Sequence, residues 1–392
     1  MAVMKKIIVC CDGTGKSGND DKPITNVHRL FKSVKPGIVD GIQQSPYYFP
    51  GIGAGKSSPG APDWWNQAVG RGLDQKIQEA YGRICRDYVD NDKIILVGYS
   101  RGAFTVRCLV DMVDIITKCG LLTIDGLTHW PELYKLWKKE SADLEEYCKN
   151  LESDIRRKIR INICAVWDTV SSIGVPLPGL FGRHRPGSPN FIHSDLREGV
   201  DKAFQALALH ERRHHFHSIV WKRTANTEKA RTSLDQCWFV GYHSDIGGGR
   251  KDEALAHIAL VWMMSRLQDD IKFRPDGFWN PEPKYTNYVT VKDSMTLPYR
   301  LARSSDRKPR AQFWTSKKLI EAKPDVDNVS EERIHSTVGF FHGLKAKQLP
   351  IGPPVRTMNR RIKGTIAEWG FKYKSRGIFQ LCGAAEDTGY TV

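Results

Sequence analysis

One stretch of the chain constrains its fold more than any other. Lys93–Gly98 contains a run of Ile, Leu and Val and continues directly into Tyr99-Ser100-Arg101-Gly102. Apolar residues then recur at helical spacing across Ala103–Ile116. The pattern predicts a strand, a tight turn and a helix, with glycines where the strand and helix backbones crowd together. A serine at the tip of such a turn is a candidate nucleophile, so Ser100 is the first predicted site residue.

The rest of the chain repeats this alternation of strand and helix. Short apolar runs that end in Gly or acidic turns alternate with longer amphipathic stretches, which predicts a doubly wound α/β fold with a mostly parallel sheet. We expect strands at Lys6–Cys11, Ser45–Phe49, Lys93–Gly98, Ile159–Trp167 and Cys237–Tyr242, the last being the final clear strand of the sheet. We expect helices at Gln67–Tyr88, Ala103–Ile116 and Asp195–Leu209.

The predicted organisation is one core with additions. The core spans residues 1–260. It contains a helical insertion at 120–155, where the sequence becomes charged and aromatic, and a lid-like insertion at 176–235, which begins with several prolines. Residues 261–392 have a weaker pattern and are expected to form an irregular C-terminal extension that packs on the core or caps it.

A nucleophilic serine needs a base, usually a histidine held by a carboxylate. In a fold with this serine turn the chain order is Ser, acid, His. Asp168 follows the strand Ile159–Trp167, and His243 follows the strand Cys237–Tyr242. Both residues satisfy the order and lie at strand ends, so we predict a Ser100-Asp168-His243 triad.

Three other residues stay open as alternatives. Asp111 lies on the helix after the nucleophile, and Asp245 follows His243 closely, so either could be the acid. His335 could be the base if the C-terminal part of the chain folds over the site.

Acyl transfer through a serine also needs N–H donors for the developing oxyanion. The residue after the nucleophile commonly supplies one donor, and a loop after an early strand supplies the other. Arg101 is the first candidate, and Gly13 or Thr14, in the turn after Lys6–Cys11, is the second. Asp12 is expected to shape this loop rather than to transfer protons.

Cysteines and histidines give no sign of a metal site. The nine cysteines include no CxxC pair, and the histidines of 210–217 are almost consecutive in a basic segment. We therefore predict no metal and no organic cofactor, with free thiols in a reducing compartment.

The location of the protein is predicted from two absences. Met1–Asp12 is too short and polar for the apolar region of a signal peptide, and no apolar run reaches the roughly 18 residues of a spanning helix. These features predict a cytoplasmic protein, with export by a route that needs no cleaved signal left open.

The ordered motifs resemble a known family, the α/β-hydrolases similar to the bacterial type VI secretion lipase effectors. The motifs are Asp12-Gly13-Thr14, Thr25-Asn26-Val27, Pro50-Gly51-Ile52-Gly53, Gly98–Gly102, Val166–Val170 and His243–Gly249, within roughly residues 5–345. The resemblance implies an α/β-hydrolase fold and a Ser-Asp-His esterase that acts on phospholipids.

The predicted function is hydrolysis of lipid esters, with phospholipids as the leading substrates and a small soluble ester as the other substrate class. The net charge of +15 favours approach to an anionic membrane surface. Nucleic acid is not the expected partner, and the oligomeric state is left open. The alternative from a different class is an inactive hydrolase-fold scaffold that binds acidic partners or nucleic acid through its basic surface.

Overall fold

A computed structural model describes most of the chain between residues 3 and 274, and isolated pieces beyond. The described residues are 3–18, 23–53, 72–156, 159–170, 194–213, 216–229, 231–251, 253–274, 288–290, 294, 306–307, 312–314, 319–321, 330–335, 338, 361–363, 371–373 and 379–381. All structural statements below concern these residues.

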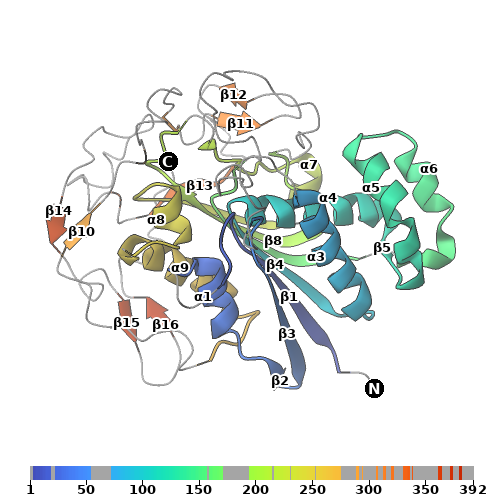
Figure 1. Cartoon of the computed structure of the whole chain (residues 1–392), viewed down its shortest axis with the longest axis horizontal. Coiled ribbons are helices and arrows are strands. Elements are labelled where there is room, and N and C mark those ends of the chain that lie inside the picture. Colours follow the sequence, from blue (N-terminus) through green and yellow to red (C-terminus); the bar gives the residue numbers. More distant parts are fainter. Residues whose placement is uncertain are drawn as a thin grey trace, which may run out of the picture.

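An eight-stranded sheet forms the centre of the molecule (Figure 1). Its strands lie in the order β13-β9-β8-β7-β4-β1-β3-β2, and every neighbouring pair is parallel except β2 with β3. The predicted α/β fold with a mostly parallel sheet is therefore confirmed. The strands are β1 Lys5–Cys11, β2 Gly37–Val39, β3 Ile42–Phe49, β4 Lys93–Tyr99, β7 Ile161–Trp167, β8 Val200–Ala208, β9 Ser233–Phe239 and β13 Glu332–Ile334.

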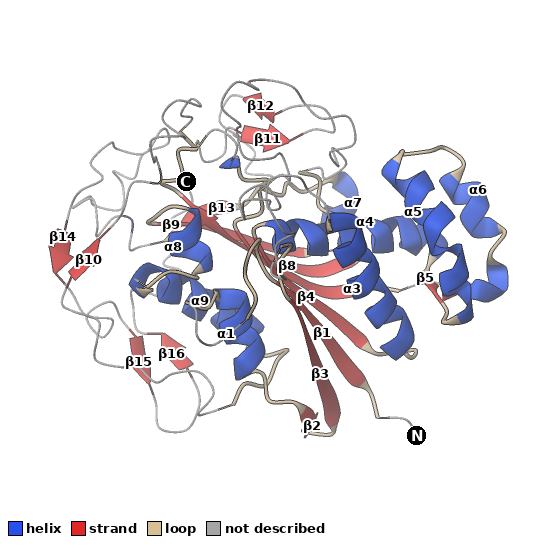
Figure 2. Cartoon of the chain, viewed as in Figure 1, coloured by secondary structure: helices blue, strands red, loops and turns tan. Residues whose placement is uncertain are grey.

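Helices cover both faces of this sheet (Figure 2). Helices α3 (Leu73–Asp87) and α4 (Arg101–Cys119) lie on one face, and α1 (Asn26–Ser33) and α9 (Ala254–Leu267) lie on the other. Successive side chains of a strand point to opposite faces. Accordingly Ile7 and Val9 of β1 belong to the apolar cluster under α3 and α4, whereas Ile8 and Cys10 belong to the cluster under α1 and α9.

The region expected to form a helical insertion contains short helices between two short strands. Strand β5 (Leu121–Leu122) pairs with β6 (Ile155–Arg156). Between them lie η1 Asp125–His129, α5 Trp130–Lys138, α6 Leu144–Lys149 and η2 Glu152–Asp154. Buried Trp130, Leu133 and Trp137 join this region to the same apolar cluster as α3 and α4, so it packs on the core.

Two expectations between residues 176 and 235 need correction. The predicted helix Asp195–Leu209 is wrong, because Val200–Ala208 is the buried strand β8 between β7 and β9. The predicted lid therefore contains a strand of the central sheet. The spacing of Ala and Leu here resembles a helical stripe, but a strand buried on both faces needs no alternation of polar residues, and tertiary packing overrode the local preference. The part of the expected lid at 176–193 lies outside the described residues.

The sheet also extends beyond the strand expected to be its last. Strand β13, from the predicted C-terminal extension, pairs in parallel with β9. Three short antiparallel pairs and two short helices complete the described elements: β10 Tyr288–Thr290 with β14 Arg361–Lys363, β11 Gln312–Trp314 with β12 Leu319–Glu321, β15 Phe371–Tyr373 with β16 Phe379–Leu381, α7 Ala225–Lys229 and α8 His243–Gly247. The division of the chain into a core and an extension stays a prediction.

The described residues contain neither a membrane-spanning helix nor a metal-binding cluster. No helix there combines the length and apolarity needed to cross a membrane. No group of three or more His, Cys, Asp or Glu side chains is arranged to hold a metal ion. Six cysteines are buried free thiols, but Cys148 is disulfide-bonded, which differs from the expected set of free thiols.

Candidate active site

The turn between β4 and α4 has the backbone geometry that the motif predicted. Ser100 has φ 56° and ψ −120°, a conformation that an L-residue adopts only under strain. A Cβ at Gly98 would lie 2.6 Å from Ala103 Cα, and one at Gly102 would lie 2.0 Å from the backbone oxygen of Cys11. No larger residue fits at either position without moving backbone, so both glycines are required by close approach.

The three residues of the predicted triad lie together at one edge of the sheet. Strands β4, β7 and β9 share one direction, and Ser100, Asp168 and His243 each follow one of them. His243 Nε2 lies 2.8 Å from Ser100 Oγ, and His243 Nδ1 lies 2.6 Å from Asp168 Oδ2. All three side chains belong to buried residues. The contacts form a continuous hydrogen-bond chain from hydroxyl to carboxylate.

Four donors hold the carboxylate of Asp168. Its Oδ1 accepts from Ala208 N–H at 3.1 Å and from Arg307 Nη1 at 2.5 Å, and its Oδ2 accepts from His243 and from Arg307 Nη2 at 3.1 Å. Burial alone would raise the pKa of Asp168, but the Arg307 charge and the His243 hydrogen bond outweigh burial and lower this pKa to about 2. Asp168 is therefore ionised at neutral pH.

His243 is enclosed by aromatic rings and held through its backbone. Its ring centroid lies 4.8 Å from that of Tyr99 and 5.2 Å from that of Phe216, the latter edge to face. Burial lowers the pKa of His243 below its ordinary value, although Asp168 opposes the shift. The imidazole is thus neutral at physiological pH, the state in which it can accept a proton.

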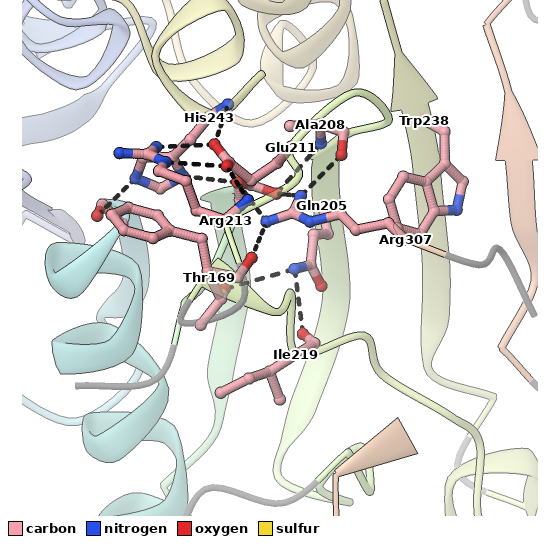
Figure 3. Close-up of polar contacts among 12 residues, drawn as sticks. Thr169, Gln205, Ala208, Glu211, Arg213, Ile219, Trp238, His243 and Arg307 are labelled. Atoms are coloured by element: carbon pink, nitrogen blue, oxygen red, sulfur yellow. Dashed lines mark hydrogen bonds and ion pairs between the residues drawn. The ribbon is translucent and has the colours of Figure 1, made fainter. Parts of the chain in front are cut away.

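Glu211 and Arg213 form a second charged pair beside the histidine (Figure 3). Arg213 donates to both oxygens of Glu211, at 2.9 and 2.7 Å, and its guanidinium lies 3.5 Å from the centre of the Phe216 ring. Glu211 Oε2 also accepts from the His243 backbone N–H at 3.3 Å. Burial would raise the pKa of Glu211, but Arg213 lowers it, so Glu211 is ionised and the pair is ionic.

The loop after β1, in which the sequence predicted an oxyanion donor, lies beside Ser100. A Cβ at Gly13 would lie 3.3 Å from Ser100 Cβ. The Gly13 N–H, however, donates to Asp12 Oδ1 at 2.6 Å, so this donor is already engaged. Thr14 is therefore the better candidate of the two, and the same residue carries a buried hydroxyl oxygen, Oγ1, with no hydrogen-bond partner among the described residues. Arg101 N–H lies in the first turn of α4, where amides have no acceptor within the helix.

Asp12 organises this loop. Its Oδ2 accepts from Thr25 Oγ1 at 2.6 Å and from the Tyr48 hydroxyl at 2.7 Å, while Oδ1 holds Gly13. Burial raises the pKa of Asp12 to about 6, in spite of these three donors. The contacts agree with a role in shaping the loop.

The raised pKa of Asp12 predicts a loss of stability as the pH rises. Between its ordinary value of 3.8 and about 6, the folded chain binds more protons than the unfolded chain, so the free energy of unfolding falls as pH increases. The loss is on the order of 3 kcal/mol. Asp12→Asn should remove it. Urea unfolding of both proteins from about pH 4 to pH 7 measures the difference, and parallel stability curves would contradict the prediction.

The structure places the three alternative residues in other contacts. Asp111 pairs with Arg197, at 2.9 Å from its Nε. Asp245 accepts from the backbone N–H of Tyr242 at the start of α8. The ring of His335 stacks on Phe239, with centroids 4.7 Å apart. None of these contacts joins Ser100, whereas His243 contacts Ser100 directly and Asp168 contacts His243.

Sequence comparison places the chain in a family. Residues 5–266 match the catalytic domain described as that of Tle1-like phospholipase effectors of the type VI secretion system. The chain belongs to this family. The matched range contains all three residues of the hydrogen-bond chain, and it ends before Arg307.

Individual relatives of this Tle1-like chain are distant. An uncharacterized protein of Saccharomyces cerevisiae is 28% identical over 200 residues, which cover 45% of this chain and 28% of the yeast protein. A solved Tle1 effector bound to the VgrG spike is 18% identical, with a TM-score of 0.36, and covers 64% of this chain and 52% of its own. An uncharacterized Pseudomonas aeruginosa structure is 15% identical, with a TM-score of 0.39 and coverages of 71% and 48%. The chain thus spans at most about half of each relative's length.

Proposed function

We propose that this Tle1-like chain is a serine hydrolase that cleaves carboxylic esters of lipids, with phospholipids as the leading substrate class. The observation that carries the proposal is the hydrogen-bond chain from Ser100 through His243 to Asp168. The serine stands at a strained strand-to-helix turn and faces a neutral imidazole, which is the arrangement that activates a hydroxyl as a nucleophile.

The reaction proceeds through an acyl-serine. Ser100 Oγ attacks the ester carbonyl carbon while its proton passes to His243 Nε2, and Asp168 balances the charge of the imidazolium. The N–H groups of Arg101 and Thr14 are the proposed donors to the oxyanion. When the intermediate collapses, the bond to the leaving oxygen breaks and His243 protonates that oxygen. Water then gives a proton to His243 as it attacks the acyl carbon. When this second intermediate collapses, the bond to Ser100 Oγ breaks, His243 returns the proton to Oγ, and the carboxylic acid leaves. No metal or organic cofactor takes part.

Two features support a lipid substrate. The family is described by its phospholipase effectors, and the net charge of +15 favours adsorption to anionic headgroups. The VgrG spike is a partner of the Tle1 effector in its solved structure. For this chain we propose a lipid or small ester as substrate and an anionic membrane surface as the place of action.

A fluorophosphonate probe tests the proposal directly. We expect the wild-type protein to be labelled at Ser100, as located by mass spectrometry, and Ser100→Ala and His243→Ala to remain unlabelled. His335→Ala serves as the control and should label like the wild type. Hydrolysis of phospholipid vesicles and short esters then identifies the substrate class. A folded wild type that is not labelled, even with lipid present, would contradict the proposal and favour a scaffold that binds acidic partners.

A further inference from the structure

We infer that Arg307, from the C-terminal part of the chain, is a positioning residue that fixes the triad carboxylate and sets the pH at which His243 can act as a base. The inference rests on the proposed serine hydrolase. Arg307 lies beyond the range that matches the family's catalytic domain, residues 5–266. The conventional triad therefore depends on a residue outside the matched domain.

The burial of Arg307 is the first argument. Its side chain is 1% exposed. A guanidinium cannot lose its charge in a protein, so its removal from water is costly unless several acceptors surround it. Arg307 has four: Asp168 Oδ1, Asp168 Oδ2, the carbonyl oxygen of Ala208 at 2.8 Å and that of Phe216. Figure 3 shows Arg307 reaching toward the cluster that contains Glu211 and His243. These acceptors form a buried binding site that fits one guanidinium group.

The geometry at Asp168 is the second argument. Arg307 binds both carboxylate oxygens, through Nη1 and Nη2, so the planar guanidinium fixes the plane of the carboxylate. Asp168 has a positive φ of 43°, which favours glycine, so its backbone alone is a strained support. The carboxylate plane decides where Oδ2 meets His243 Nδ1, and this contact directs Nε2 toward Ser100.

Charge balance is the third argument. Among the described residues, the charged groups around His243 and its carboxylate partner are Asp168, Glu211, Arg213 and Arg307. Two are negative and two are positive, so the cluster is neutral when the imidazole is neutral. Tyr99 also packs against this ring, but burial raises its pKa and keeps its phenol uncharged.

Loss of the Arg307 charge would leave one uncompensated carboxylate beside His243. The imidazolium would then be favoured, and the pKa of His243 would rise. The pKa of Asp168 would rise as well, because burial would no longer be opposed by the arginine. Protonation of either His243 or Asp168 inactivates the triad. Because both pKa values rise, activity is lost at a higher pH than in the wild type when the solution is acidified.

Two substitutions separate charge from geometry. Arg307→Met removes both, and we expect fluorophosphonate labelling at the pH optimum to slow by roughly 100-fold and the acidic midpoint to rise by about one pH unit or more. Arg307→Lys keeps the charge but cannot bind two oxygens in a fixed fork. We expect it to slow labelling roughly 10-fold, with the acidic midpoint unchanged.

Arg266→Met is the matched control. Arg266 also pairs with a partly buried aspartate, Asp235, at 2.7 Å, and its side chain is 20% exposed. Asp235 lies near the N-terminal end of β9, whereas the triad lies beyond the C-terminal ends of the strands. We expect wild-type labelling and an unchanged midpoint from Arg266→Met. Circular dichroism and thermal melting verify that each variant is folded.

The titration of His243, followed by NMR with nitrogen-labelled histidine, gives a readout that needs no reaction at Ser100. The His243 signal is assigned from its loss in His243→Gln. A rise in the His243 pKa in Arg307→Met that is absent from Arg307→Lys and Arg266→Met supports the inference. This result stands even if Ser100 proves unreactive, because an unreactive Ser100 would overturn only the proposed function. If folded Arg307→Met has the wild-type His243 pKa and the wild-type acidic midpoint of labelling, the inference about Arg307 is overturned. If Arg307→Met does not fold, Arg307→Lys decides. Labelling of Arg307→Lys by the probe at the wild-type rate would overturn the inference.

Discussion

Asp168→Asn is expected to lower the rate of ester hydrolysis by roughly four orders of magnitude, because it leaves His243 in the wrong tautomer. Arg307 needs an acceptor, so the amide oxygen of the new side chain would turn toward the guanidinium and its NH2 group toward His243 Nδ1. His243 Nδ1 would then accept a hydrogen bond from this NH2 group, and the proton of the imidazole ring would move to Nε2. A protonated Nε2 cannot take the proton of Ser100.

Asp111→Asn is the control for this change. Asp111 is also a buried aspartate paired with an arginine, Arg197, but it lies along α4 away from the triad. Steady-state hydrolysis of a soluble short ester by both variants measures the difference. A large loss in Asp111→Asn together with nearly full activity in Asp168→Asn would assign the acid to Asp111 and contradict the proposed triad.

Gly102→Ala is expected to destabilise the fold by about 3 kcal/mol or more. The new methyl group would lie 2.0 Å from the backbone oxygen of Cys11 and 2.6 Å from that of Asp12. Both atoms belong to the backbone at the end of a central strand, so no flexible side chain can move aside. The change therefore displaces β1 or α4.

The matched control is Gly82→Ala in helix α3. There the nearest atoms to a new Cβ belong to the flexible side chain of Arg86, at 3.5 Å or more. Removing a glycine from a helix interior should raise stability by about 0.5–1 kcal/mol. Urea unfolding of the two variants and the wild type at one pH gives the comparison. Equal midpoints for Gly102→Ala and the wild type would show that the turn has more room than the structure indicates.

The sequence predicted the parts of the site that depend on local pattern. A strand, a serine turn and a helix follow one another within a single segment around Ser100, and the acid and the histidine each follow a strand. Because parallel strands end at the same edge of a sheet, residues such as Asp168 and His243 meet without any further information. The ion pair of buried Glu211 with Arg213 was missed, because in the sequence both residues belong to a basic segment that is typical of a surface loop.

Arg307 could not be found in this way. Its contact with Asp168 joins residues 139 positions apart, and its neighbours in the sequence are polar and basic with no periodic pattern. Strand β8 was missed for a different reason. Its Ala, Gln and Leu residues favour a helix, and only burial between two other strands makes the extended conformation better. Both errors arise from contacts that local sequence does not encode.

The edge strand β13 has a consequence for the order in which the protein matures during translation. Until residues 332–334 leave the ribosome, the outer edge of β9 has no partner from β13, and an open strand edge pairs readily with other chains. Domains begin to fold during synthesis, at roughly 5–20 residues per second. A nascent chain that has completed β9 must therefore wait several seconds with this edge exposed. Ribosome stalling or truncation in that interval would favour aggregation over release of a folded chain.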